Sequence, residues 1–120
     1  MIELPHHHSA GGNTDKILEK LSQIEDFQAV SLLFKQLCDP TRLRIFWLLC
    51  HCEQCVVNIA ALMDMTAPAI SHHLRALRGS SLISSRRDGK EVYYRATDNL
   101  QAVTLHHMLE RIMDLTCPES

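Results

Sequence analysis

Residues 66–95, with the sequence TAPAISHHLRALRGSSLISSRRDGKEVYYR, decide the fold of the chain. Apolar residues recur in the first half of this stretch at i, i+4 and i+7, the spacing of one helix face: Ile70, Leu74 and Leu77. Polar residues share a second face roughly a quarter of a turn away: Ser71, Arg75 and Arg78. The pattern predicts a helix that packs with one face and leaves the other free to contact a partner.

A β-hairpin is predicted to follow this helix, which Gly79 is suited to end. Residues 82–83 and 92–94 are short β-prone runs, and Asp88-Gly89 lies between them. Asp-Gly favours a tight hairpin turn because Gly tolerates a positive φ. A helix followed by a basic hairpin is typical of winged helix-turn-helix proteins, in which the helix enters the DNA major groove and the hairpin, or wing, lies along the backbone.

The basic residues of the chain are concentrated in the same stretch. It holds six Lys and Arg residues against two acidic residues, a net charge of +4, within a chain whose net charge is −2. The remaining residues therefore carry a net charge of −6. This asymmetry indicates a localised surface for a polyanion such as double-stranded DNA.

Four motifs follow one another in the chain: DPTRLRIFWLL at residues 39–49, CVVNIAALM at 55–63, APAISHHLRALR at 67–78 and RRDGKEVYY at 86–94. Together they resemble the ArsR/SmtB family of winged-helix, metal-sensing bacterial repressors, and the resemblance runs from about Phe27 to the C-terminus. It implies a mainly α-helical fold with a β-hairpin wing and a dimer that pairs its first and last helices. It also implies repression of transcription that a metal ion relieves.

The length of the chain favours one domain. At 120 residues, 46% of them hydrophobic, there is room for a modest core. We assign this domain to residues 13–117, after a flexible N-terminal arm at 1–12 and before a tail at 118–120. The N-terminus lacks the basic and apolar regions of a signal peptide, and no later run is long and apolar enough to span a membrane. These features favour a cytoplasmic protein without a membrane partner.

Further helices are predicted on both sides of the central stretch. Asp39-Pro40 is suited to begin one, because Asp caps helices well and Pro is tolerated at the first helical position. Residues 56–63 form a short helix, and residues 98–117 a long one whose apolar residues cover a wide arc. Such an arc suggests burial both within the subunit and against a second copy, as in a homodimer. Cys38 is expected in the core and Arg42 at the surface.

The predicted helix and wing supply the candidate DNA contacts. Arg75 is suited to a bidentate contact with guanine, and Ser71 and His72 would reach base edges or phosphates from the exposed side. Arg78 belongs to the same face, whereas His73 lies nearer the apolar face and is expected to pack there. The wing would contact phosphates through Arg86, Arg87 and Lys90. A homodimer would read an inverted-repeat operator.

The cysteines point to a soft metal ion. Five cysteines are many for a reducing compartment, where disulfides are rare. Cys52 and Cys55 have the C-x2-C spacing of a thiolate pair, and Cys50 is a third thiol within reach. The Cys-Val-Cys pattern of many family members reads Cys55-Val56-Val57 here, so Cys52 would supply the missing thiolate. The available further donors are Cys117, His106, His107, His6, His7 and His8. The predicted effector is a thiophilic metal or metalloid ion such as Zn, Cd, Pb or As.

The resemblance also implies a second candidate metal site on the last helix. Family members carry Asp-x-His there, followed by His-x2-Glu or His-x2-His. In this chain Asp98-x-Leu100 lacks the histidine, whereas His107-x2-Glu110 retains the second pair. His107, Glu110 and Asp114 share a helix face at i, i+3 and i+7 and form this second candidate set.

Two other functions stay open at this point. Cys50 and Cys117 resemble, with a shift of about one helical turn, the cysteine pair through which some family members sense oxidants or persulfides; such a pair needs Cα atoms within about 7 Å. A winged-helix protein-interaction module without DNA affinity is the alternative from a different class, and the basic hairpin argues against it. No nucleophile motif, phosphate loop or carboxylate pair suggests an enzyme.

Overall fold

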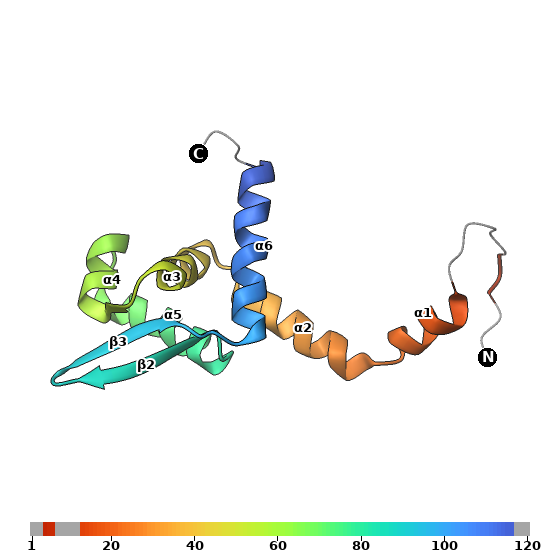
Figure 1. The fold of residues 1–120 in the computed structure, drawn as a ribbon, viewed down its shortest axis with the longest axis horizontal. Coiled ribbons are helices and arrows are strands. Elements are labelled where there is room, and N and C mark those ends of the chain that lie inside the picture. The colour runs from red at the N-terminus through yellow and green to blue at the C-terminus, as the bar shows by residue number, and fades with distance from the viewer. Residues whose placement is uncertain (1–3, 7–12, 117–120) are drawn as a thin grey trace. The chain divides into compact units, whose positions relative to one another are not determined.

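The computed structural model describes residues 4–6 and 13–116, so most of the predicted arm and all of the predicted tail lie outside the described residues. The chain divides into two compact units, residues 1–32 and 33–120. Its elements, coloured along the chain in Figure 1, are α1 (Thr14–Leu21), α2 (Ile24–Gln36), α3 (Pro40–His51), β1 (Gln54–Cys55), α4 (Val56–Met63), α5 (Ala67–Gly79), β2 (Ile83–Asp88), β3 (Glu91–Ala96) and α6 (Leu100–Thr116).

The first unit holds α1 and most of α2. Asn13 caps α1, because its Oδ1 accepts a hydrogen bond of 3.2 Å from the backbone N–H of Lys16. α1 and α2 are separate helices, with a break at residues 22–23. Neither α1 nor α2 has a buried residue, and Ile17 and Phe27 are about half exposed. These helices therefore present apolar side chains without a core of their own.

Side-chain caps begin two helices of the second unit, and the cap at Asp39 is the predicted one. The Oδ1 of Asp39 accepts a hydrogen bond of 3.0 Å from the backbone N–H of Arg42 at the start of α3. Thr66 caps α5 in the same way, with its Oγ1 3.3 Å from the backbone nitrogen of Ala69. Between α4 and α5, Asp64 adopts a left-handed conformation with φ 53°. The predicted helix-turn-helix is thus formed by α4 and α5.

The core of this unit lies where α3, α4, α5 and the start of α6 meet the base of the hairpin. Three side chains from three helices are fully buried there: Phe46, Ile59 and Leu77. The apolar face predicted for α5 is the buried one. The complete cluster is Ile45, Phe46, Leu49, Ile59, Met63, Ile70, Leu74, Leu77, Leu82, Ile83, Ala102 and Leu105.

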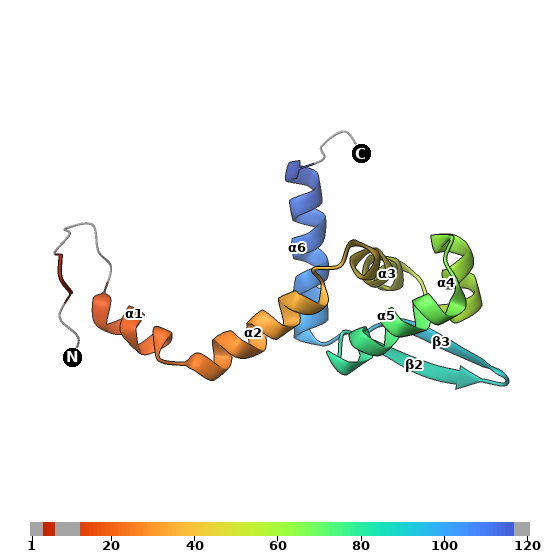
Figure 2. The same ribbon diagram turned by 180° about the vertical axis from the view of Figure 1, so that it is seen from behind.

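A three-stranded antiparallel sheet, in the order β1-β3-β2, forms the wing and its base. The turn between β2 and β3 contains Gly89 with φ 64°, as the Asp-Gly signal predicts. In both views the hairpin runs beside α5, and β3 leads into α6 at its base (Figures 1 and 2). The sequence did not predict β1, in which Gln54 and Cys55 pair with Tyr94 and Tyr93 of β3.

Two expectations about single residues are wrong. Cys38 follows the last turn of α2 and is exposed, not in the core. Arg42 is half-buried: its Nε donates a hydrogen bond of 3.2 Å to Nδ1 of His73, and its Nη1 donates one of 2.9 Å to Oε1 of Gln36. His73 is 9% exposed, in agreement with its expected packing role. Arg42 thus joins the end of α2, the start of α3 and the middle of α5.

The last helix is slightly shorter at its start than predicted. Asn99 precedes α6, and its Oδ1 accepts a hydrogen bond of 2.8 Å from the backbone N–H of Ala102. Ala102 and Leu105 are buried, whereas most of the apolar residues after them are exposed. Among the described residues, no helix combines the length and the apolar character needed to cross a membrane.

Replacing Leu77 by alanine is expected to lower the free energy of unfolding by about 2–5 kcal/mol, because the side chain is completely buried and its neighbours would fill the space only in part. The measurement is urea unfolding at fixed protein concentration. Leu100→Ala, at a position 78% exposed, is the matched control and should change stability by less than about 0.5 kcal/mol. Equal effects of the two substitutions would contradict this description of the core.

Candidate functional site

The exposed face of α5 carries the predicted DNA-reading side chains. Burial of Ile70, Leu74 and Leu77 turns Arg75 and Arg78 to the outside. His72 is exposed on the same helix, and Ser71 is half-buried. A hollow of about 510 Å³ lies between this face and the hairpin, lined by Ser71, Leu74, Arg75, Arg78, Gly79 and Tyr94. The helix therefore offers hydroxyl, imidazole and guanidinium groups next to the wing.

The basic residues of the wing differ in whether they form an ion pair with a carboxylate elsewhere in the chain. Arg87 and Lys90 are exposed near the hairpin turn, and the Nε of Arg87 donates a hydrogen bond of 3.3 Å to the carbonyl of Gly89. Arg86 is also exposed, but its guanidinium is occupied by a carboxylate within the chain. The structure therefore leaves Arg87 and Lys90 free to approach a phosphate, whereas Arg86 would first have to leave its partner.

That partner is Glu53, in the segment between α3 and β1. The Nε of Arg86 lies 3.0 Å from both carboxylate oxygens of Glu53, and its Nη2 lies 2.6 Å from Oε1. The guanidinium carbon also lies 5.0 Å from the centre of the Tyr93 ring, within the range of a cation–π contact. Hydrogen bonding from Arg86 lowers the pKa of Glu53, and the same bond raises the pKa of Arg86. This ion pair ties the cysteine-containing segment to the wing.

Two described cysteines of this segment lie in or just before β1. Cys52 is the capping residue that follows α3, and its Sγ lies 3.5 Å from the carbonyl oxygen of Leu48 and 3.7 Å from Nε2 of Gln54. Cys55 is 8% exposed and pairs with Tyr93 in the sheet. A metal ion bound by Cys52 and Cys55 would therefore link the end of α3 to the short strand that pairs with the wing.

Cys50 is half-buried, and burial together with the nearby Glu110 carboxylate raises the pKa of its thiol to about 11. Cys117, the other residue of the predicted redox pair, lies outside the described residues, as do His7 and His8. Within the part of the chain that the structure describes, no three of the thiols lie within 4.8 Å of one another. The thiolate site therefore stays a prediction about the metal-bound protein.

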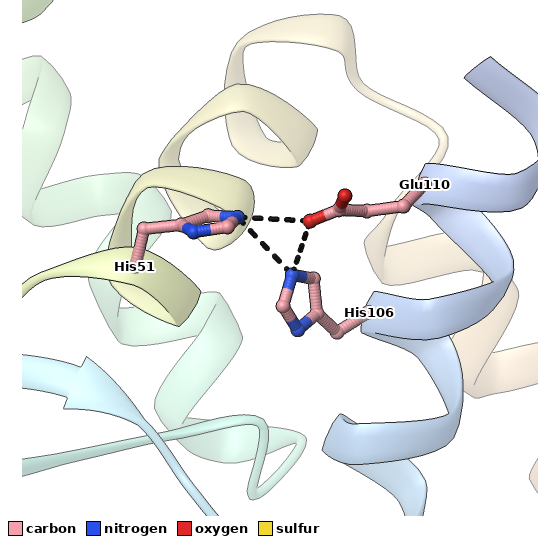
Figure 3. Close-up of side chains that lie close together, drawn as sticks. All are labelled: His51, His106 and Glu110. Carbon is pink, nitrogen blue, oxygen red and sulfur yellow. Dashed lines mark hydrogen bonds and ion pairs between the residues drawn. The ribbon is translucent and has the colours of Figure 1, made fainter. Parts of the chain in front are cut away.

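The last helix contributes to a different cluster from the predicted set of His107, Glu110 and Asp114. Glu110 faces α3, where its Oε1 lies 2.9 Å from Nε2 of His51, and on its own helix the same oxygen lies 2.7 Å from Nε2 of His106. The two Nε2 atoms are 3.2 Å apart (Figure 3). His107 and Asp114 are exposed and do not belong to this cluster.

Hydrogen bonds from His106 and His51 lower the pKa of Glu110, so the carboxylate is ionised in this arrangement. From the sequence, His106 was predicted only as one of several further donors, and His51 was not predicted as a ligand. The i, i+4 spacing of His106 and Glu110 was visible in the sequence, but their contact with His51 depends on how α6 packs against the end of α3.

The chain is similar to known bacterial regulators. Residues 39–85 match the family described as bacterial regulatory protein, arsR family. A transcriptional repressor SmtB homolog from Synechocystis is 37% identical over 84 residues, which span 70% of this chain and 64% of that protein, a little under two thirds of its length. The cadmium resistance transcriptional regulatory protein CadC of Listeria innocua is 39% identical over 83 residues, spanning 67% of this chain and 70% of CadC.

Solved structures agree with this similarity. The homodimeric winged helix-turn-helix DNA-binding domain of a possible ArsR-family regulator from Mycobacterium bovis has a TM-score of 0.66 and 25% sequence identity, and the match covers 89% of this chain and 91% of that one. The winged helix-turn-helix prediction is therefore confirmed, and the matched proteins are regulators rather than enzymes. The motifs, the fold and the relatives together show that this chain belongs to the ArsR/SmtB family of winged-helix transcriptional repressors.

Proposed function

We propose that the protein is a homodimeric repressor that binds an inverted-repeat DNA operator and is released by a thiophilic metal or metalloid ion. The observation that carries the DNA-binding part is the division of α5 into a buried apolar face and an exposed face with Arg75 and Arg78 beside the wing. A helix of this kind can enter the major groove while the wing follows the phosphate backbone.

Each part of the surface has its own task in DNA binding. Arg75 donates two hydrogen bonds to a guanine edge, and Ser71 and His72 contact neighbouring bases or phosphates. Arg78, Arg87 and Lys90 contact phosphates, which gives affinity that weakens with added salt. Arg86 would join them only after its ion pair with Glu53 opens.

The apolar residues that the chain leaves exposed support the homodimer. Those on α6 include Met108, Ile112 and Met113, with exposed fractions of 38%, 50% and 41%. A groove of about 530 Å³ lies beside them, lined by Pro40, Leu43, Arg44, Trp47, Leu48, Leu62, Met63, Leu109 and Met113. Contiguous apolar surface of this kind usually marks an interface, and a two-fold dimer would place two copies of α5 about one turn of DNA apart.

Cys52 and Cys55 are the proposed effector ligands, with Cys50 and Cys117 as further donors. The name of the Listeria relative refers to cadmium, a soft ion that prefers thiolates. Binding of the ion would displace β1, which pairs with β3, and Glu53, which forms an ion pair with Arg86 of the wing. An ion that favours the DNA-incompetent dimer weakens DNA binding by the same coupling free energy, typically about 1–3 kcal/mol.

Replacing Arg75 by alanine is expected to cost about 1–3 kcal/mol of operator binding and to relax specificity at one base pair, because a base contact is lost. Lys90→Ala should weaken binding to all sequences alike and reduce the salt slope by about 1. Fluorescence anisotropy with operator and unrelated duplexes at several salt concentrations measures both effects. Arg111→Ala, an exposed cation on α6, is the control. An unchanged affinity of Arg75→Ala would argue against α5 as the reading helix.

Cd(II) is expected to lower the operator affinity of the wild-type protein by about 5- to 150-fold, the range of typical allosteric couplings. The double variant Cys52→Ser/Cys55→Ser should bind the operator equally well without metal and lose this response, because both proposed thiolates are gone. Cys38→Ser removes an exposed thiol from another part of the chain and serves as the control. Release of the double variant at the same Cd(II) concentration would rule out this pair as the effector site.

The ion pair between Glu53 and Arg86 can be tested by heteronuclear NMR titration of the Glu53 carboxyl. Its midpoint should lie below the ordinary Glu value in the wild type and rise in Arg86→Met, because the hydrogen bond from Arg86 lowers this pKa. Since the folded-state pKa is lowered, the stabilisation is present above the ordinary pKa and is lost as the pH falls through the lowered one. Arg87→Met is the control. The same midpoint in wild type and Arg86→Met would mean that the pair does not form in solution.

A further inference from the structure

We propose that His51, His106 and Glu110 form a second metal site, which binds one divalent ion of borderline softness such as Zn(II) between α3 and α6. This inference goes beyond the proposed function, because it requires neither the thiolate effector nor DNA binding. Among the described residues, it is the group of three His, Cys, Asp or Glu side chains whose ligand atoms lie within 4.8 Å of one another.

The distances between the ligand atoms suit a small cation. Two Nε2 atoms and one carboxylate oxygen form a triangle with edges of 2.7, 2.9 and 3.2 Å (Figure 3). Ligands about 2.0–2.1 Å from a tetrahedral Zn(II) ion lie roughly 3.3–3.4 Å apart. The three side chains therefore need only small outward movements to surround an ion, with no change in the backbone.

Hydrogen bonds satisfy the three ligand atoms of this triangle less completely than a metal ion would. Two neutral imidazoles that both carry hydrogen on Nε2 can each donate to Oε1 of Glu110, but no hydrogen then remains for the contact of 3.2 Å between the two nitrogens. A cation at the centre accepts a lone pair from each of the three atoms at once. The arrangement is thus better matched to a metal ion than to a hydrogen-bonded network.

The ligands are held by two helices in different ways. His51 is the last residue of α3, and its ring lies against Trp47, with 4.4 Å between the ring centres. His106 and Glu110 are one turn apart on α6 and so point in the same direction. A bound ion would fasten the end of α3, from which the cysteine-containing segment leaves, to the helix that carries the exposed apolar surface.

The site is open to an ion from solution. The side chains of His51 and Glu110 are 43% and 46% exposed, and that of His106 is 23% exposed. Three protein ligands with solvent access leave room for water to complete a tetrahedral shell. Two imidazoles and one carboxylate suit Zn(II), Co(II) or Ni(II), whereas arsenite favours thiolates. The site therefore differs from the Cys52 and Cys55 pair in the ions that it selects.

The test uses Co(II) as a spectroscopic probe of the 120-residue chain, because thiolate ligands give a charge-transfer band that imidazole and carboxylate ligands lack. His6, His7 and His8 are replaced by alanine throughout, so that the N-terminal imidazoles do not contribute. The variants His106→Gln and Glu110→Gln each remove one proposed ligand with little change in shape. His107→Gln is the matched control, since His107 is the next residue on α6 but lies outside the cluster.

In the parent protein with Cys50, Cys52 and Cys55 replaced by serine, one Co(II) is expected to bind with weak visible bands and no thiolate band, and the ligand variants and the control are compared in this same background. His106→Gln and Glu110→Gln should each lose more than about tenfold in Co(II) affinity, a loss that even replacing a residue that only orients a metal ligand commonly causes. Zn(II) should raise the melting temperature of the parent and of His107→Gln but not of the two ligand variants.

Equal Co(II) affinity in the parent and in His106→Gln would overturn the proposal, as would binding that disappears with the cysteines. Circular dichroism without metal shows whether each variant is folded. If His106→Gln is unfolded, the Co(II) affinity of folded Glu110→Gln is compared with that of the parent instead. Equal Co(II) affinities in that comparison also overturn the proposal.

Discussion

The hydrogen bond between Arg42 and His73 fixes the helix on which the rest of the structure depends. α5 must bury one face and keep the other free, and the contact of 3.2 Å places a polar link within that buried face. Nδ1 of His73 can accept this bond only while the imidazole is neutral, and burial lowers the pKa of His73, which favours the neutral form. Because the folded-state pKa is lowered, this stabilisation is present above the ordinary His pKa and fades as the pH falls below it.

Helix α3 takes part in both proposed functions, DNA binding and metal binding. Near its start, Arg42 positions the DNA-reading helix and also binds the carbonyl and side-chain oxygens of Gln36. At its end the chain passes through His51, Cys52 and Glu53, which contact Glu110 of α6, Gln54 of β1 and Arg86 of the wing, respectively. A change at the end of α3 thus has short structural routes both to the wing and to the helix with the exposed apolar surface.

Local signals explain how much of the fold the sequence could predict. Asp39 and Thr66 cap their helices through side-chain oxygens, Gly89 supplies the positive φ of the hairpin, and the periodicity of Ile70 and its neighbours marks the buried face. β1 was missed because two residues carry no periodicity and pair only with a strand about 40 residues later. The contacts of the candidate sites were harder to predict for the same reason. Glu53 contacts Arg86, and His51 contacts His106, through tertiary packing that no local sequence pattern encodes.

Residues 51–55 contact several different elements, and this arrangement would let one short segment take part in both proposed metal sites. His51 points to α6, Glu53 reaches the wing, and Cys55 is buried at β1, so neighbouring residues act on different elements. A soft ion bound by thiolates would act through β1 and the Glu53–Arg86 pair, whereas a borderline ion bound by imidazoles would act through α6. In these proposals, an ion binds the ligand set whose softness matches its own, and the ligand set determines which element of the structure the ion displaces. The two proposed responses would be separable, because Cys52 and Cys55 form one proposed ligand set and His51, His106 and Glu110 the other.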